Sequence, residues 1–270
     1  MPLNRTLVVI PHFNNPAGLY STLASIEQTE SVDLLVVDDG SVDRPNWASV
    51  QAAFGAQGDA AVEYLPKNQG IVAALNYAVS WANSKGYEFI GRLDAGDHCV
   101  GERFAIQEAE MRSKPELVLL GCWVDVVSEQ GNHLFNLRYP TRDQDIRRAL
   151  HRYNPFVHPA VMIRLDAIFN VGGYPSGFPA LEDWACFFEL SRKGVVANYP
   201  QVLLQYVVHS DSVSTRRRRD QSKSKVRLLL KEYDASIPAT IGILKSIILL
   251  LVPRSVTTTF KVWARGRGGR

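Results

Sequence analysis

Residues 34–41, LLVVDDGS, join a continuous apolar run to a turn that contains two aspartates. A short run of this kind, ended by turn residues, is typical of a strand that is buried on both faces of a parallel sheet. Residues 7–10, LVVI, form a similar run that ends at Pro11, and residues 17–28 between the two runs are helix-like. Strand, helix and strand in this order predict a βαβ unit with two parallel strands.

The same pattern recurs further along the chain. Residues 62–65 and 88–93 are two more candidate strands, and residues 70–84 between them predict a helix with one apolar side. The fourth strand is followed by residues 94–97, DAGD. Ligands of open α/β sheets bind beyond the carboxyl ends of the strands, near the point where the strand order reverses. We therefore expect the two acidic turns, residues 38–41 and 94–97, to face one crevice.

The rest of the chain has a less regular pattern. Predicted strands lie at residues 117–121, 123–127, 160–164 and 202–208, and predicted helices at residues 101–113, 143–151 and 182–193. The chain has 270 residues, of which 46% are hydrophobic and 21% charged, and this is enough to build one core. We expect a single α/β domain with a mainly parallel central sheet over residues 1–215, followed by a helical tail over residues 216–270.

The tail carries much of the positive charge, although the net charge of the chain is only +3. Four consecutive arginines, Arg216 to Arg219, precede an apolar stretch at residues 237–252, in which the only charged residue is Lys245. This stretch is shorter than the roughly 20 residues that cross a bilayer. It suits a helix that lies on an anionic membrane surface, and it equally suits a helix that packs on the core or forms a homodimer.

Cysteine use and the N-terminus both favour a cytoplasmic location. Cys99, Cys122 and Cys186 have no CxxC spacing and are expected to be reduced structural thiols. The N-terminus reaches its first apolar run within ten residues and shows no signal-peptide pattern. We expect a cytoplasmic protein, held peripherally at the inner face of the membrane if the tail binds lipid.

Five short motifs follow one another along the chain. They are residues 9–14 (VIPHFN), 36–41 (VVDDGS), 67–70 (KNQG) with Ala74 and Asn76, 92–97 (RLDAGD) and 182–183 (ED). In this order, over about residues 5–214, they resemble the family 2 glycosyltransferases of GT-A fold. The resemblance implies inverting transfer of a sugar from a nucleoside-diphosphate sugar to a hydroxyl of a saccharide or lipid-linked acceptor, with UDP the favoured nucleotide. It also implies a role in bacterial cell-surface polysaccharide synthesis.

Asp94 and Asp97 are the candidate metal ligands. Departure of a nucleoside diphosphate leaves negative charge that a cation stabilises, and paired carboxylates suit Mn²⁺ or Mg²⁺. The resemblance adds His209, after a tyrosine-containing strand, as a further ligand. Gly96 stands where the family has the middle aspartate of its acidic signature, which leaves open whether a metal is required. A turn whose aspartates cap the following helix is the structural alternative.

The donor site is predicted at the ends of the first, second and fourth strands. The resemblance places nucleoside contacts at Asp38 and Asp39, whose carboxylates suit ribose hydroxyls or a base N–H. Positive side chains near the crevice suit the diphosphate. The other residues assigned to the donor are Pro11 and Phe13 as a wall against the base, Lys67 and Arg92 as cations, and Asn68 and Asp94 beside them.

Asp183 matches the position of the family's catalytic base. An inverting displacement needs a base within hydrogen-bonding reach of the acceptor hydroxyl. Trp184 offers an aromatic face for a sugar ring, and Glu182 and His158 are assigned to the acceptor side. The alternative for Glu182 and Asp183 is that they are helix N-terminal acids that interact with the helix dipole.

Other functions fit parts of the sequence. A nucleotidyltransferase would also use acidic strand ends, but residues 11–18 lack a glycine-rich basic phosphate loop. A non-catalytic nucleotide-sugar-binding or assembly subunit of the same fold is favoured by Gly96 and opposed by the presence of Asp97 and Asp183. Few aromatic residues accompany the arginines of the tail, so we expect no nucleic-acid partner.

Overall fold

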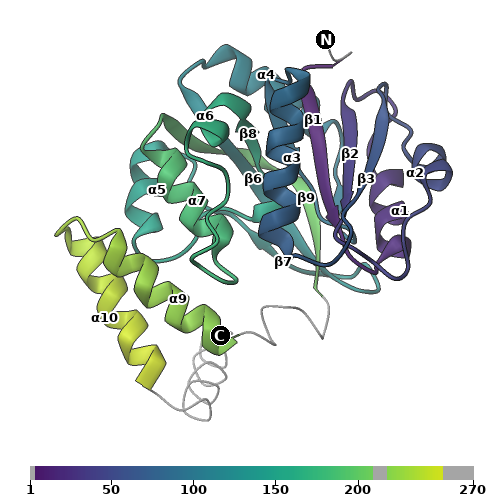
Figure 1. The fold of residues 1–270 in the computed structure, drawn as a ribbon. Coiled ribbons are helices and arrows are strands. Elements are labelled where there is room, and N and C mark those ends of the chain that lie inside the picture. The colour runs from purple at the N-terminus through teal and green to yellow at the C-terminus, as the bar shows by residue number, and fades with distance from the viewer. Residues whose placement is uncertain (1–3, 209–217, 252–270) are drawn as a thin grey trace.

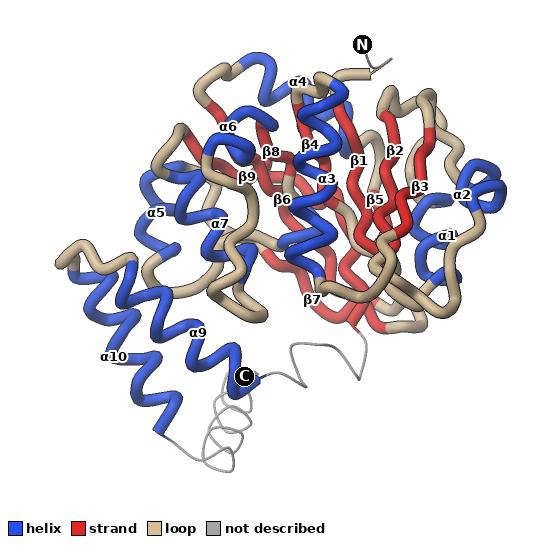
Figure 2. The backbone as a smooth tube through the Cα atoms, in the orientation of Figure 1, coloured by secondary structure: helices blue, strands red, loops and turns tan. Residues whose placement is uncertain are grey.

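The computed structural model describes residues 4–208 and 218–251 (Figure 1). Within them a curled sheet of nine strands forms the middle of the fold, with helices on both of its faces (Figures 1 and 2). The strands are β1 (Thr6–His12), β2 (Asp33–Asp38), β3 (Ala60–Tyr64), β4 (Phe89–Arg92), β5 (His98–Cys99), β6 (Leu117–Ser128), β7 (His133–Leu137), β8 (Met162–Arg164) and β9 (Val195–Val208).

The order of the strands positions the expected crevice. Along the sheet the order is β3-β2-β1-β4-β8-β6-β9-β5, and β7 pairs with β6. β1 lies between β2 and β4 and is parallel to both, whereas β8 is antiparallel to β4 and β6. The chain therefore runs outward from β1 to β3 and then returns to the other side of β1. Because of this reversal, a ligand-binding crevice is expected beyond the carboxyl ends of β1 and β4.

Burial on both faces explains the continuous apolar runs of the first strands. Leu7 and Val9 of β1 pack on one face of the sheet, and Val8 and Ile10 pack on the other, because successive side chains of a strand point to opposite sides. All four are at most 1% exposed. An alternation of apolar and polar residues would have left one of these faces in water.

The helices divide between the two faces of the sheet. On one face lie α3 (Ile71–Lys85), α5 (Asp143–Leu150), α6 (Leu165–Asn170), α7 (Glu182–Ser191) and α9 (Arg218–Lys231). On the other lie α1 (Pro16–Ala24), α2 (Trp47–Ala53) and α4 (Arg103–Ser113). Figure 1 shows α3 crossing the front of the sheet. The remaining helices are the short 3₁₀ helix η1 (His158–Ala160) and α10 (Ile237–Leu251).

The predicted fold class and most predicted elements are confirmed, with some differences. Residues 117–127, predicted as two strands, are one long strand, β6, whose pairing with β9 shifts register around Cys122 and Trp123. The sequence pattern missed α2, α6, β5, β7 and the first half of β9. β7 is mostly exposed and α2 buries only Val50, so neither shows an apolar period. The expected structural thiols are confirmed as buried and free in Cys99, Cys122 and Cys186.

The helices α9 and α10 form a hairpin beside α5 and α7 (Figure 1). Leu228 and Leu229 of α9 are at most 1% exposed and belong to the main core cluster. α10 approaches the chain at Gly242, where a Cβ atom would lie 1.8 Å from the carbonyl oxygen of His151. α9 therefore completes the core of the preceding domain, and the boundary predicted at residue 215 lies outside the described residues. None of the described helices has the length and apolarity needed to span a bilayer.

Candidate active site

The turn after β4 carries Asp94 on a buried arginine. Arg92, the last residue of β4, is fully buried, and its Nη2 donates to Asp94 Oδ1 at 2.6 Å. Its Nη1 donates to the carbonyl oxygen of Leu93. The side chain of Asp94 keeps 36% of its surface exposed. Arg92 therefore supports the turn and orients Asp94, and its guanidinium does not lie free in the crevice.

Asp97, in the same turn, has one carboxylate oxygen without a partner. Oδ1 accepts from the backbone N–H of Val207 on β9 at 2.9 Å, whereas Oδ2 is buried and has no hydrogen-bond partner in the part of the chain described. Burial, and then the neighbouring charge of Asp94, raise the pKa of Asp97 well above its ordinary value. A cation between the two carboxylates would satisfy the free oxygen and relieve the repulsion, so the pair fits a hard divalent ion.

The backbone at Gly96 explains the missing middle aspartate. Its φ is 115°, in a region that residues with a side chain rarely adopt. Its N–H donates to Thr22 Oγ1 at 2.8 Å, which ties the turn to α1. The turn therefore offers two carboxylates, those of Asp94 and Asp97. Residues 4–208 and 218–251 contain no group of three or more metal-ligating side chains, and His209 lies outside these ranges.

The two aspartates after β2 are buried and hydrogen-bonded within the protein. Asp38 Oδ1 lies 2.9 Å from His12 Nδ1, and its Oδ2 accepts from a backbone N–H of the same turn. The carboxylate of Asp39 accepts from the N–H groups of Gln69 and Gly70, each at 2.8 Å. The two carboxylates thus join the ends of β1 and β2 to the start of α3. The nucleoside contacts assigned to them stay predictions.

Residues of the adjoining loops form the rim of the donor side. Gly40, with a φ of 69°, lets the DDGS turn close on the next loop, because a Cβ atom there would lie 2.3 Å from the carbonyl carbon of Lys67. Lys67 and Asn68 are exposed, and Phe13 at the end of β1 is 49% exposed. Pro11 is partly buried in β1. An exposed aromatic ring at this edge suits the flat face of a base.

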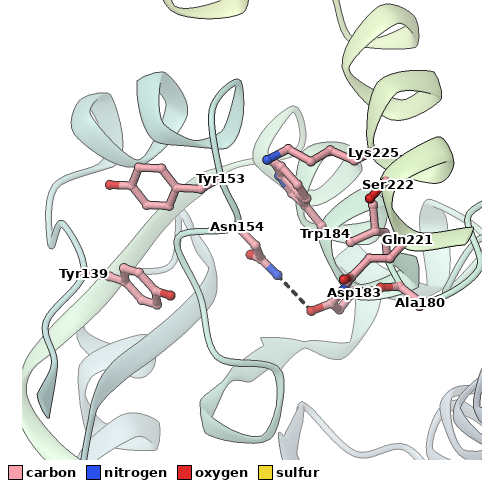
Figure 3. Close-up of a pocket in the computed structure, with 10 residues that line it drawn as sticks. Tyr139, Tyr153, Asn154, Ala180, Asp183, Trp184, Gln221, Ser222 and Lys225 are labelled. Carbon is pink, nitrogen blue, oxygen red and sulfur yellow. Dashed lines mark hydrogen bonds between the residues drawn. The ribbon is translucent and has the colours of Figure 1, made fainter. Parts of the chain in front are cut away.

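Asp183 lines a cavity of about 400 Å³ between α7, α9 and the segment before η1 (Figure 3). It lies in the first turn of α7, and its Oδ2 accepts from Asn154 Nδ2 at 2.8 Å. Burial, followed by the charge of Glu182, raises the pKa of Asp183 to about 7. A carboxylate with a pKa near neutrality is suited to take a proton from a hydroxyl group.

The two residues that flank this aspartate in sequence are buried. Glu182 is 9% exposed, and burial raises its pKa. Trp184 is 3% exposed and donates from Nε1 to the carbonyl oxygen of Leu150 at 3.0 Å. Its ring stacks with Phe188, and the ammonium group of Lys225 lies 5.2 Å from its centroid. Trp184 therefore forms part of the cavity wall, with its ring already in contact with protein groups.

His158 of η1 pairs with Tyr174. Its Nε2 lies 3.1 Å from the hydroxyl oxygen of Tyr174, which precedes α7. Burial, and then the charge of Arg92, lower the pKa of His158 well below its ordinary value. The imidazole is therefore neutral, and it links η1 to the loop that leads to Asp183.

Two tyrosines lie within electrostatic reach of both Asp94 and Asp183. Burial has the largest effect on the pKa of Tyr174 and of Tyr206, and the charges of Asp94 and Asp183 raise both further. For Tyr206, on β9, the pKa rises to about 12.

A model of the family described as Glycosyl transferase family 2 matches residues 7–171. The chain belongs to this family. Among its relatives, the amylovoran biosynthesis glycosyltransferase AmsE of Erwinia amylovora is 31% identical over 225 residues, which are 82% of each chain. A UDP-Gal:alpha-D-GlcNAc-diphosphoundecaprenol beta-1,3-galactosyltransferase of Escherichia coli is 25% identical over 199 residues, 73% of this chain and 70% of that one.

Solved structures of other glycosyltransferases share the fold. The mannosyltransferase PcManGT from Pyrobaculum calidifontis, in complex with GDP-Man and Mn²⁺, has a TM-score of 0.65 and 16% sequence identity. The match covers 98% of this chain and 76% of that one. This family 2 glycosyltransferase therefore has the GT-A fold that its motifs predict.

Sequence reasoning missed several residues that shape the site of this glycosyltransferase. Asn154 holds the carboxylate of Asp183. Asn76 accepts from the N–H of Tyr174 at 2.7 Å and donates to its carbonyl oxygen at 2.9 Å, so α3 holds the loop before α7. Ala180, three residues before Asp183, has a φ of 61°, which is unusual for a residue other than glycine. Asn76 belongs to the third motif, but no local pattern indicates that its partner is Tyr174.

We expect the turnover of this glycosyltransferase to rise with pH through about 7. Asp183 acts as a base only when deprotonated, so kcat/KM should fall about tenfold per unit below its pKa of about 7. Asn154→Ala should move this fall in kcat/KM, the acid limb of the profile, to higher pH. The substitution removes a hydrogen bond that lowers the pKa of Asp183. Profiles of kcat/KM against pH measure both, with the exposed Asn132→Ala as control. A limb that does not move in Asn154→Ala would contradict the assignment.

Proposed function

We propose that this glycosyltransferase moves a sugar, with inversion, from a nucleoside-diphosphate sugar to a hydroxyl of a saccharide or lipid-linked acceptor. The observation that carries the proposal is the position of Asp183, which lies in the wall of a cavity of about 400 Å³ with its carboxylate held by Asn154. Asp183 takes the proton of the acceptor hydroxyl while the oxygen of that hydroxyl attacks the anomeric carbon of the donor sugar. The nucleoside diphosphate leaves from the opposite face of the sugar.

Asp94 and Asp97 would hold a divalent cation, Mn²⁺ or Mg²⁺, with His209 as a further proposed ligand. The unpartnered, buried Oδ2 of Asp97 supports this assignment, and so does the similar mannosyltransferase structure with Mn²⁺. When bound, the cation supplies positive charge to the departing diphosphate. Arg92 keeps Asp94 oriented for this role through its 2.6 Å hydrogen bond.

A UDP-sugar is the proposed donor. The Escherichia coli relative is named for UDP-Gal, whereas the mannosyltransferase with the same fold binds GDP-Man. The exposed ring of Phe13 and the exposed cation Lys67 lie near the carboxyl ends of the strands, where donors bind in open sheets. The residues that we propose for direct donor binding are Pro11, Phe13, Asp38, Asp39, Lys67, Asn68 and Asp94, and we propose that the buried Arg92 acts by orienting Asp94.

We place the reaction in bacterial cell-surface polysaccharide synthesis. AmsE of Erwinia amylovora is named for amylovoran biosynthesis. The Escherichia coli relative is named for an acceptor sugar on diphosphoundecaprenol, which supports a lipid-linked acceptor for this chain. His158, Glu182 and Trp184 are proposed to shape the acceptor side of the site, around the cavity that Asp183 lines.

A donor screen tests the proposed function. UDP-sugars and GDP-sugars are incubated with Mn²⁺ and with N-acetylglucosamine linked through a diphosphate to a short polyprenol, and release of nucleoside diphosphate is measured. We expect release of UDP that depends on the acceptor. Donor binding without release, with neutral and lipid-linked acceptors alike, would instead identify a non-catalytic binding or assembly subunit, the alternative that Gly96 suggests.

We infer that α10 lies on the anionic inner face of a membrane. Ile237, Ile241, Leu244 and Ile248 are 45–76% exposed and recur every three or four residues, so they form one apolar stripe. Lys245 of α10, which is exposed, supplies positive charge that attracts anionic lipids. Because α9 also lines the acceptor cavity, this placement would bring a lipid-linked acceptor to the base.

The full-length protein should therefore sediment with anionic vesicles and not with neutral ones. Leu244→Glu combined with Ile248→Glu should abolish sedimentation, because the charges oppose burial of the stripe in lipid, and should leave turnover of a soluble acceptor unchanged. Leu134→Glu with Phe135→Glu, at two exposed apolar residues of β7, is the matched control. If the protein does not bind vesicles but forms a dimer that Leu244→Glu disrupts, the partner of α10 is a second copy of this chain.

A further inference from the structure

The acceptor cavity contains a cation to which the proposed transfer assigns no role. Lys225 of α9 lines the same cavity as Asp183. Figure 3 shows its side chain extending from α9 across Trp184, with the ammonium group on the side of Tyr153. The nitrogen lies 5.2 Å from the centroid of the Trp184 ring. The stem of Lys225 is therefore packed, and its charge is held at the cavity.

No carboxylate among the described side chains neutralises Lys225 by an ion pair. Lys231, six residues further along the same helix, pairs with Glu189 at 2.8 Å. The electrostatic neighbour that acts on Lys225 is another cation, Lys245 of α10, and burial together with this charge lowers the pKa of Lys225. A partly buried ammonium group with a like charge beside it favours the binding of an anion.

The remaining walls of the cavity suit a sugar. Tyr139 and Tyr153 stack with their ring centroids 6.0 Å apart, and Tyr153 is 39% exposed. Aromatic rings with polar edges provide apolar faces and hydroxyl groups for a sugar ring. The cavity therefore combines an aromatic platform, the base Asp183 and an unneutralised cation, Lys225 (Figure 3).

We propose that Lys225 binds an anionic group of the acceptor, a phosphate or a carboxylate, while the reacting hydroxyl faces Asp183. The inference rests on the proposed function and adds the class of acceptor, an anionic glycoside. It gives α9 a part in acceptor selection, although α9 lies beyond residues 7–171, which the family model matches. The donor diphosphate belongs to the other side of the crevice, near Asp94 and Asp97, so donor binding does not involve Lys225.

Calorimetric binding of three acceptor probes tests the proposal. The probes are N-acetylglucosamine linked through a diphosphate to a short polyprenol, the octyl glycoside of glucuronic acid, and the neutral octyl glycoside of N-acetylglucosamine. Lys225→Met keeps the stem over Trp184 and removes the charge. It should weaken binding of an anionic probe at least about tenfold, the scale of one charge-assisted hydrogen bond, and leave the neutral probe and the donor unaffected.

Two further variants separate charge from packing. Lys225→Arg keeps the charge and should restore most of the affinity for the anionic probe. Lys223→Met, at an exposed lysine two positions earlier on α9, is the matched control and should bind all probes like the wild type. Thermal melting of each variant checks that α9 remains packed on the core.

The outcomes distinguish the source of the anion and the two proposals. If only the affinity for the diphosphate probe depends on Lys225, the anionic group of the acceptor is a phosphate. If only the affinity for the glucuronide depends on Lys225, that group is a carboxylate. Unchanged binding in Lys225→Met, or an equal loss for the neutral probe, overturns the anion site. An assay of sugar transfer on the same samples tests the proposed function separately. If transfer occurs but binding of the anionic probes does not depend on Lys225, only the anion site is wrong. If binding depends on Lys225 but no transfer occurs, only the proposed transferase function is wrong.

Discussion

Asp183→Asn should lower turnover at least about 100-fold, the scale of a general base, while donor affinity changes by no more than a few-fold. The amide keeps the shape of the carboxylate and still accepts the hydrogen bond of Asn154, which in the wild type is 2.8 Å long. It cannot, however, take a proton from the acceptor hydroxyl. The donor is expected near Asp94 and Asp97, so its binding does not require this carboxylate. Rates of nucleoside diphosphate release and calorimetric donor binding measure the two quantities.

Thermal melting of Asp183→Asn distinguishes loss of the base from loss of the folded structure. The folded-state pKa of Asp183, about 7, lies above the ordinary value for an aspartate. The contribution of this group to stability is therefore present at low pH and lost as the pH rises through about 7. Asp183→Asn should thus melt no lower than the wild type at pH 8.

A matched control tests the helix-dipole alternative. Asp166→Asn removes another acid from the first turn of a helix, α6, away from the cavity, and it should keep full turnover. Near-normal turnover of Asp183→Asn as well would leave Asp183 with only the role of a helix N-terminal acid.

The second large effect is expected at the carboxylate pair after β4. EDTA should lower turnover at least about 100-fold, because a cation at a leaving diphosphate is worth several kcal/mol, and added Mn²⁺ should restore it. Asp97→Asn should cause a similar loss that added Mn²⁺ does not reverse. The amide keeps an acceptor for the N–H of Val207 but lacks the negative charge that the ion needs.

The control for this experiment is an aspartate outside the crevice. Asp145→Asn, exposed on α5, should respond to EDTA and Mn²⁺ like the wild type. Equal turnover in EDTA and in Mn²⁺ would rule out the cation and would attribute catalysis to the protein groups alone, in agreement with the two-carboxylate turn that Gly96 imposes.

Local patterns predicted the parallel half of the sheet well. Each of its first two strands is buried on both faces, so burial appears directly as a run of apolar residues, and an acidic turn follows the second run. The other half was harder to predict. β7 is an exposed strand, and the first half of β9 mixes apolar residues with Asn198 and Pro200. Their strand conformation comes from pairing with β6, which no local pattern reports.

The sequence by itself determined the fold class and the chemical groups of the site, because burial periods and strand-end motifs are local properties of the chain. Only the tertiary structure decided which of those groups remain free. Asp38 and Asp39 are bonded to backbone and side chains of neighbouring loops, whereas Asp97 keeps an unpartnered oxygen.

The tertiary structure also brought Asn154, 29 positions earlier in the chain, to Asp183, and Lys225, from the helix after β9, to the cavity that Asp183 lines. The pKa of Asp183 and the position of Lys225 depend on how α7 and α9 pack on the sheet. Desolvation and packing of this kind arise between segments that are distant in the chain, and the order of residues does not reveal them.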